Sequence, residues 1–304
     1  MTTYIICGPT ASGKSSLSLD LAHYKKGNII NADSMQMYKD LPILSAQPSN
    51  DNHKEIPHFL YGSLGITETH SVGKWLEKIR YLLPKHPNHP SLFVGGTGLY
   101  IKSLLEGLSP IPDVPESLRS ELSSLLLSSS KEHVFDLLQK EDPLSAQKIG
   151  PHNSQRILRA LEVIRYTKKS LVDWQKEPRE KIAKFPLPIK IILIDPDREA
   201  LYESINHRVS SMLESGAIEE VTALKERGIT PSHTSIKTIG YEEIFAYLDH
   251  ALSRKEMIEQ IQQKTRNYAK RQITWFRHQL SPDLIWPKVY SHPQWTDFLS
   301  EMKW

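Results

Sequence analysis

A glycine-rich segment near the N-terminus has residue types and spacing suited to binding phosphate groups. It runs from Gly8 to Ser15 (GPTASGKS), with two glycines five residues apart followed by lysine and serine. Such a phosphate loop curls so that backbone N–H groups point at phosphate oxygens. Lys14 would neutralise the terminal phosphates, and the Ser15 hydroxyl would ligate Mg²⁺. We therefore predict a di- or triphosphate bound by Gly8, Pro9, Thr10, Ala11, Ser12, Gly13, Lys14 and Ser15.

A second polar segment, Asn31 to Tyr38, offers a carboxylate at Asp33. It follows a short apolar run, so Asp33 is expected at the carboxyl edge of a parallel sheet, where the phosphate loop also opens. A carboxylate there can accept a proton from an incoming nucleophile. An aspartate that caps the next helix is the alternative for the same position. Ser34 and Gln36 are suited to hydrogen bonding the edge of a base, which a phosphate acceptor would not require.

The elements that must position these residues alternate between strands and helices. Short apolar runs at Tyr4 to Cys7, Asn28 to Ile30 and Leu92 to Val94 each lead into glycine, asparagine or aspartate. Helical patterns begin near Gly13 and near Val72. Short buried strands separated by helices are typical of a parallel sheet in an α/β domain.

The character of the chain changes in the proline-rich segment 109–115. From Glu116 to about Lys184 we find helical patterns and no convincing strand, and two more prolines close this section. The run Ile189 to Ile194 then predicts another buried strand, which ends at Asp195. From Leu201 to about Leu280 the chain again has helical patterns.

These segments predict an α/β fold: a P-loop NTPase-like parallel-sheet core with an inserted all-helical domain and a helical C-terminal region. We assign residues 1–110 and 186–304 to the catalytic core and residues 111–185 to the insertion.

Composition excludes several classes of protein. The 304 residues are 39% hydrophobic and 24% charged with a net charge of +3, which is ordinary for a soluble globular chain. The single cysteine, Cys7, excludes a disulfide framework and a cysteine zinc site, and we expect a buried core thiol. The N-terminus lacks a signal pattern, and no stretch approaches the roughly 18 apolar residues of a membrane span. We expect a cytoplasmic protein without a membrane partner.

The phosphate loop by itself leaves three functions open. A small-molecule or nucleotide kinase would need a magnesium-associated acid, and Asp195 at the end of its strand fits loosely. An enzyme with a diphosphate leaving group would use the same loop without that acid. A non-catalytic RNA-binding NTPase is the third class. The run Leu92 to Val94 leads into Gly95-Gly96-Thr97-Gly98 and offers no acid.

Over nearly its whole length the chain resembles the tRNA dimethylallyltransferase family. The resemblance rests on seven ordered blocks: Gly8–Ser15; Asn31–Tyr38; Val94–Tyr100; Gln155–Val163; His207–Val209 with Met212 and Gly216; Ile239–Glu243; and Thr265–Gln272 with Thr274–Phe276. It implies transfer of a dimethylallyl group from dimethylallyl diphosphate to N6 of the adenosine 3′ of the anticodon (position 37) in tRNA. The products would be N6-isopentenyladenosine and diphosphate.

The resemblance also implies roles for individual residues. Asp33 would be the general base that takes the proton from N6, and Thr97 would lie beside the bridging oxygen of the diphosphate. Arg208 would bind the diphosphate together with Lys14, and Mg²⁺ is the implied cofactor. The RNA would contact Asp33, Ser34, Met35, Gln36, Thr97 and Arg119.

Two groups of basic residues favour contact with an RNA backbone. The segment 264–280 contains no acid, and Arg266, Lys270, Arg271 and Arg277 are among its cations. We place the rings of Tyr268 and Trp275 in the core. The resemblance assigns a second segment to the anticodon loop: Gln155, Arg156, Ile157, Leu158 and Arg159. A solvated basic helix face is the alternative for both groups.

The pattern departs from the family in three places. Gln47 stands where a lysine is usual, Phe59 stands after His58 where a second histidine is usual, and Asn267 stands where an arginine is frequent. We expect tRNA and dimethylallyl diphosphate as partners, no obligate protein partner, and a monomer.

Overall fold

The computed structural model describes residues 2–49, 54–179, 188–231 and 237–302 of the chain. These fall into two compact units. One comprises Met1–Leu105 and Ala183–Trp304, and the other comprises Glu106–Ile182.

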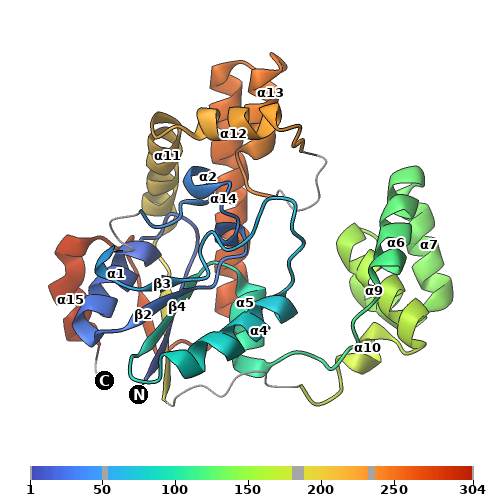
Figure 1. Cartoon of the computed structure of the whole chain (residues 1–304), viewed down its shortest axis with the longest axis horizontal. Helices are drawn as coiled ribbons and strands as arrows, with labels where there is room; N and C mark the ends of the chain where they lie inside the picture. The colour runs from blue at the N-terminus through green and yellow to red at the C-terminus, as the bar shows by residue number, and fades with distance from the viewer. Residues whose placement is uncertain (1, 50–53, 180–187, 232–236, 303–304) are drawn as a thin grey trace. The chain divides into compact units, whose positions relative to one another are not determined.

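The first unit is built on a six-stranded, all-parallel sheet (Figure 1). Its strands are β1 (Thr3–Cys7), β2 (Asn28–Asn31), β3 (His58–Phe59), β4 (Ser91–Gly95), β5 (Ile189–Ile194) and β6 (Leu284–Trp286). Their order across the sheet is β3-β2-β4-β1-β5-β6. The predicted α/β fold with a parallel sheet is confirmed, and the four predicted strands correspond to β1, β2, β4 and β5. The two strands missed, β3 and β6, are short edge strands with too few residues to give a pattern.

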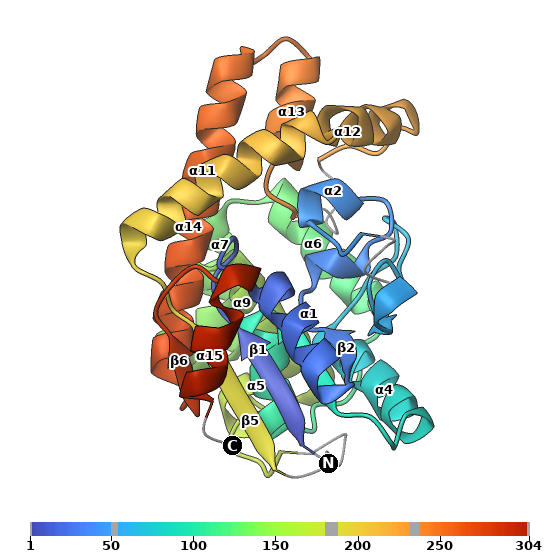
Figure 2. The same cartoon turned by 90° about the vertical axis from the view of Figure 1, so that its left-hand side faces the viewer.

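Helices cover both faces of the sheet. On one face, α1 (Lys14–Lys25) and α15 (Trp295–Glu301) pack over the sheet, as Figure 2 shows. Leu17 and Phe298 join Ile6 there in one buried cluster. On the other face lie α4 (Val72–Leu82) and α5 (Gly98–Glu106), where the Trp75 ring contacts the rings of Phe93 and Tyr100. Successive side chains of a strand point to opposite faces, which is why these strands have continuous apolar sequences.

The chain after β5 forms the predicted helical region: α11 (Arg198–Glu214), α12 (Ala217–Glu226), α13 (Tyr241–Leu248) and the long α14 (Arg254–Gln279). A capping box of Ser253 and Glu256 starts α14. The buried residues of α14 recur every three to four positions. One face of the helix therefore packs on α11 and α13, and the other face is exposed to solvent. The buried residues are Met257, Ile261, Thr265, Ala269, Gln272 and Phe276. The short elements of this unit are η1 (Met35–Met37), α2 (Pro42–Ser45), η2 (Leu83–Lys85) and η3 (His292–Gln294).

The second unit is a cluster of helices, drawn in green to yellow-green in Figure 1. They are α6 (Glu116–Ser128), α7 (Lys131–Glu141), α8 (Pro143–Ile149), α9 (Ser154–Thr167) and α10 (Leu171–Trp174). Leu122, Leu138 and Leu161 lie in its apolar core. The buried Asp142 carboxylate caps α8 at the Ser145 N–H and accepts a hydrogen bond from the Ser170 hydroxyl at the start of α10. Within the described part of the chain, no helix is both long and apolar enough to cross a lipid bilayer.

Candidate active site

Three loops meet at the carboxyl edge of the sheet because β2, β4 and β1 are neighbours. The phosphate loop follows β1, the Asp33 segment follows β2, and the segment Gly96–Thr97 follows β4. The strand ends are in register, since Cys7 pairs with Gly95 and Asn31 pairs with Val94. Glycine is required at position 95, because a Cβ there would lie 2.2 Å from the backbone of Ala32. The predicted phosphate-binding and carboxylate residues are therefore brought together.

The phosphate loop has the predicted strand–loop–helix context and is supported from outside by distant residues. Gly13 begins α1 with φ of 89°, a conformation that favours glycine. The Tyr290 N–H donates to the Ser12 carbonyl at 2.9 Å, and the Ser204 hydroxyl donates to the Ala11 carbonyl at 2.7 Å. The Ser12 hydroxyl is fully buried and has no hydrogen-bond partner among the described residues. The loop is thus held in shape before any ligand binds.

Two cations and one carboxylate share this site. The Lys14 ammonium is half-buried and donates to the Pro9 carbonyl at 2.5 Å. Burial lowers the pKa of Lys14 to about 8; the Asp33 carboxylate opposes this shift, and the Arg208 charge adds to it. Burial also lowers the pKa of Arg208, again opposed by Asp33. A bound polyanion would stabilise both cations, which burial alone disfavours.

Hydrogen bonds fix the orientation of the Asp33 carboxylate. Its Oδ1 accepts from the Met35 N–H at 3.0 Å, and its backbone N–H donates to Asn31 Oδ1 at 2.7 Å. Asn31 is itself held by the Trp75 indole N–H and by the Leu60 carbonyl. The bond from the Met35 N–H to Asp33 Oδ1 closes a local turn at the start of η1, whose N-cap residue is Ser34 and not Asp33. Among the described residues Oδ2 has no hydrogen bond, so it is the oxygen available to a substrate.

The Thr97 hydroxyl lies beside the Asp33 segment. Its oxygen accepts from the Ser34 N–H at 3.1 Å, and the two hydroxyl oxygens are 3.4 Å apart. Gln36 was predicted to contact a base of the RNA, but its amide nitrogen is already engaged within the protein. Its amide donates to the carbonyls of Ser45 and Ala46 at 3.1 and 2.7 Å. That nitrogen holds α2 in place and is not directed at a base.

Three tyrosines that the sequence did not single out as site residues lie in the electrostatic surroundings of Asp33. Burial raises the pKa of Tyr61, Tyr100 and Tyr268, and the Asp33 charge raises it further in each case. Their hydroxyls stay neutral at physiological pH. They lie in three separate parts of the chain, so no local pattern indicated that all three surround Asp33.

Gln272 of α14 was not identified from sequence as a site residue, yet it touches two of the loops. Its Oε1 accepts from the Thr10 N–H at 2.8 Å, and its Nε2 donates to the Gly96 carbonyl at 2.9 Å. The Thr10 N–H consequently points at Gln272, whereas the motif predicted that the loop amides point inward.

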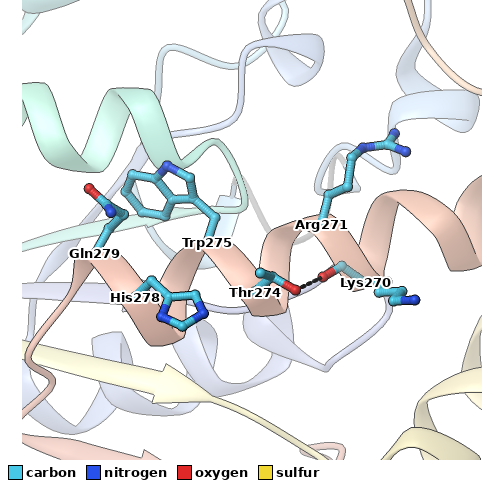
Figure 3. Close-up of a pocket in the computed structure, with 6 residues that line it drawn as sticks. All are labelled: Lys270, Arg271, Thr274, Trp275, His278 and Gln279. Carbon is cyan, nitrogen blue, oxygen red and sulfur yellow. Dashed lines mark hydrogen bonds between the residues drawn. The ribbon is translucent and has the colours of Figure 1, made fainter. Parts of the chain in front are cut away.

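The solvent face of α14 carries a shallow groove (Figure 3). The groove is lined by Lys270, Arg271, Thr274, Trp275, His278 and Gln279. Trp275 packs on Gly98, where a Cβ would lie 2.5 Å from the indole ring. The Arg271 guanidinium lies 5.7 Å from the ring of Tyr268. Both aromatic residues are half-buried, so the predicted placement of their rings in the core is only partly met.

The predicted RNA-contacting cations of α14 differ in their surroundings. Lys270 and Arg271 are exposed. Arg266 is half-buried and donates to Asn206 Oδ1 and to Gln263 Oε1, both at 3.0 Å. Lys270 and Arg271 are therefore the more accessible pair for a phosphate backbone.

In the helical unit, the predicted RNA segment lies at the start of α9. Asn153 caps this helix by accepting from the Arg156 N–H. Gln155 and Arg156 are exposed, whereas the Arg159 guanidinium pairs with Glu162 at 2.9 Å. The Ile157 side chain is 1% exposed and lies in the core of the unit, and Leu158 is half-buried against that core. These two side chains pack the helix and do not face solvent.

Arg119 is half-buried on α6, with NH1 3.8 Å from Glu116 Oε2. Its Nε is buried without a hydrogen-bond partner in the described part of the chain.

Asp195, the acid that a kinase would require, is already neutralised. Arg277 binds it through two hydrogen bonds, from Nε at 2.8 Å and from NH2 at 3.0 Å. This pair also occupies Arg277, which the sequence placed on the basic face of its helix.

Across the described ranges, no cluster of three or more His, Cys, Asp or Glu residues is arranged to hold a metal ion. The buried thiol of Cys7 is confirmed, and burial raises its pKa to about 12.

Comparisons with known proteins agree with this geometry. The family model for IPP transferase matches residues 36–279, and the model for isopentenyl transferase matches residues 1–61. A tRNA dimethylallyltransferase of Bartonella henselae is 44% identical over 282 residues, covering 93% of this chain and 97% of the relative. Another, of Rickettsia bellii, is 42% identical over 280 residues and covers 91% and 88%.

Solved structures give the same result. The full-length tRNA isopentenylpyrophosphate transferase of Bacillus halodurans matches with a TM-score of 0.68 at 31% identity, over 98% of this chain and 94% of that one. A eukaryotic dimethylallyltransferase acting on tRNA matches with a TM-score of 0.74 at 28% identity, over 90% and 69%. The parallel sheet carries a phosphate loop, Asp33 and Thr97 at one edge, and these matches extend over nearly the whole chain. The chain therefore belongs to the IPP transferase family of tRNA dimethylallyltransferases.

Proposed function

We propose that the protein transfers a dimethylallyl group from dimethylallyl diphosphate to N6 of the adenosine 3′ of the anticodon, position 37, in tRNA. The observation that carries the proposal is the placement of the Asp33 carboxylate and the Thr97 hydroxyl beside a phosphate loop whose Lys14 interacts electrostatically with Asp33. Relatives at 44% and 42% identity named tRNA dimethylallyltransferase support it. A kinase is not favoured, because Asp195 is bound by Arg277.

The leaving group is the part of the reaction that the phosphate loop serves. When the carbon–oxygen bond breaks, negative charge develops on the departing diphosphate. Lys14, Arg208 and backbone amides of the loop would stabilise that charge within a partly desolvated site. The Thr97 oxygen accepts from the Ser34 N–H, and its own proton would be donated to the bridging oxygen in place of the Ser34 hydroxyl 3.4 Å away.

The nucleophile needs positioning and removal of a proton. The N6 lone pair of adenine is delocalised into the ring, so this amine is a poor nucleophile. Asp33 Oδ2 would accept the N6 proton as the new carbon–nitrogen bond forms, while Oδ1 stays bound to the Met35 N–H. An oriented carboxylate reduces the reorganisation needed in the transition state.

Of the described residues, Ser15 would hold Mg²⁺ through its hydroxyl, which is exposed at the start of α1. A single hydroxyl would suffice, because Mg²⁺ usually takes only one or two ligands from a protein and the others from substrate phosphate and water. When bound, Mg²⁺ would supply further charge neutralisation to the diphosphate.

The RNA must present an unstacked adenine to this edge of the sheet. The groove on α14, with Lys270 and Arg271 beside the half-buried rings of Tyr268 and Trp275, suits a single-stranded loop. Gln155 and Arg156 offer a second polar contact surface on the helical unit. We further propose a cytoplasmic monomer.

One assay tests the reaction class. The protein is incubated with unmodified tRNA, Mg²⁺ and labelled dimethylallyl diphosphate, in parallel with γ-labelled ATP. We expect label from the prenyl donor in the RNA at the adenosine next to the anticodon. Transfer of phosphate label to any acceptor would support the kinase, and RNA-stimulated ATP hydrolysis without base modification would support an NTPase.

Asp33→Ala tests the assigned base. The substitution should lower base modification by a factor of about 10² to 10⁴, since it removes the proton acceptor. Binding of dimethylallyl diphosphate, measured by equilibrium dialysis, should change by less than about threefold, because Lys14 and Arg208 remain. Loss of diphosphate binding in this variant would contradict the role assigned to Asp33.

A further inference from the structure

The strongest unassigned feature of the molecule is the buried side chain of Gln272. It is 6% exposed, and both ends of its amide are engaged, one with the phosphate loop at Thr10 and the other with the segment after β4 at Gly96. A buried amide that satisfies two backbone groups of different loops fixes the separation of those loops.

The fit around this amide is tight. A Cβ at Gly96 would lie 2.2 Å from Gln272 Nε2, so glycine is needed for the side chain to enter. The Gly96 carbonyl and the Thr10 N–H are separated by more than eighty residues of sequence and belong to adjacent strand ends. Their relative position is therefore set by tertiary contacts, among which Gln272 is a direct bridge.

The bridge continues to the carboxylate. Gly96 precedes Thr97, whose hydroxyl oxygen accepts from the Ser34 N–H at 3.1 Å. Ser34 follows Asp33, whose Oδ1 is held by the Met35 N–H at 3.0 Å. A continuous series of contacts thus runs from the diphosphate-binding loop through Gln272 to the group that would accept the proton.

We propose that Gln272 is a positioning residue that sets the distance between the diphosphate-binding loop and the Thr97–Asp33 pair. This inference rests on the proposed prenyl transfer. It predicts that Gln272 governs kcat, because a displacement of about 1 Å between reacting groups lowers a rate on the order of 10²-fold. The residue does not touch the reacting atoms, so the affinity for each substrate should change less than the rate.

The test compares three variants under saturating tRNA and dimethylallyl diphosphate. Gln272→Met keeps the shape of the side chain but removes both hydrogen bonds, and should lower kcat by about 10- to 100-fold with KM for dimethylallyl diphosphate changed by less than about threefold. Thr265→Val is the control: it removes a buried hydrogen bond, from the Thr265 hydroxyl to the Ile261 carbonyl, elsewhere on α14. Its kcat per folded molecule should match the wild type.

Gln272→Glu supplies a readout that a merely structural role would not give. An ionised carboxylate can accept from the Thr10 N–H but cannot donate to the Gly96 carbonyl, whereas the protonated acid can do both. Burial raises the pKa of a carboxyl group toward the pH range of the assay. Within that range, the protonated fraction of the introduced glutamate grows as pH falls. The ratio of variant to wild-type kcat should therefore rise as pH is lowered from about 8.5 to about 6.

A Gln272→Met kcat within twofold of the wild type, or a Gln272→Glu ratio that does not change with pH, would overturn the positioning role. So would a loss of activity that the fraction of folded protein fully accounts for, measured by circular dichroism and active-site titration. If the wild-type protein shows no prenyl transfer, the proposed function itself is refuted. Failure of the positioning role and failure of the proposed function therefore give different results.

Discussion

At the scale of single residues, the site is defined by charges placed where burial disfavours them. Lys14 and Arg208 both have their pKa lowered by burial, and in both cases the Asp33 carboxylate opposes the shift. A protein that keeps two such cations together without a matching pair of acids is poised for an anion, because the ligand supplies the missing charge.

The Lys14 pKa of about 8 predicts a pH dependence of donor binding. Below that pKa the ammonium is charged and attracts the diphosphate; as pH rises through it, the free protein loses the charge. Affinity for dimethylallyl diphosphate, whose phosphates are already ionised there, should fall by up to about tenfold per pH unit above that point. Calorimetry between about pH 7 and about pH 9.5 measures this.

Lys14→Met is the matched control for that titration. It should bind the donor weakly and without the drop in affinity between neutral and alkaline pH. An unchanged pH dependence in Lys14→Met would assign the titration to a different group.

At the scale of elements, α14 links the chemistry to the RNA surface. Its buried face carries Gln272, which contacts the phosphate loop, while its exposed face carries Lys270 and Arg271 beside the groove. One helix therefore presents both an internal hydrogen-bonding residue and an external cationic surface.

The double variant Lys270→Ala/Arg271→Ala tests the exposed face. Loss of two phosphate-binding cations should weaken tRNA binding by about tenfold at physiological salt and reduce the slope of log K against log salt by about 2. Arg254→Ala/Lys255→Ala removes the same charge from exposed positions at the first turn of α14 and serves as the control. Equal losses in the two double variants, measured by filter binding, would point to general electrostatics and not to this groove.

At the scale of the whole molecule, the chain comprises two compact units with separate apolar cores. The unit with the sheet carries the phosphate loop, Asp33 and Thr97, and the helical unit carries Gln155 and Arg156. Separate cores imply that one unit can be destabilised without loss of the other's ligand site.

Asp142→Ala tests this independence. The buried carboxylate accepts from the Ser145 N–H and the Ser170 hydroxyl, so its removal should destabilise the helical unit by about 2–4 kcal/mol. Hydrogen exchange should accelerate in α6–α9 and stay unchanged in α1, and binding of dimethylallyl diphosphate should be retained. Asp173→Ala breaks a more exposed ion pair with Lys176 in the same unit and should cost less than about 0.5 kcal/mol. Faster exchange in α1 of Asp142→Ala would show that the units unfold together.

The sequence by itself determined the features that depend on neighbours in the chain. The phosphate loop is readable because its glycine spacing, its preceding strand and its following helix are all local, and Gly13 does begin α1 with positive φ. The strands β1 and β4 are buried throughout, so their apolar runs were predictable. Asp33 followed from its place after β2, and the family resemblance assigned its chemistry.

Only the tertiary structure decided which distant groups meet. The Thr10 N–H and Gln272 are 262 residues apart in sequence, and Arg277 and Asp195 are 82 apart, so no periodic pattern connects either pair. The same holds for the tyrosines around Asp33 and for Gln36, whose amide is used to hold α2. Side-chain partners of this kind depend on the strand order and on the helices packed across it, and a local pattern carries no information about either.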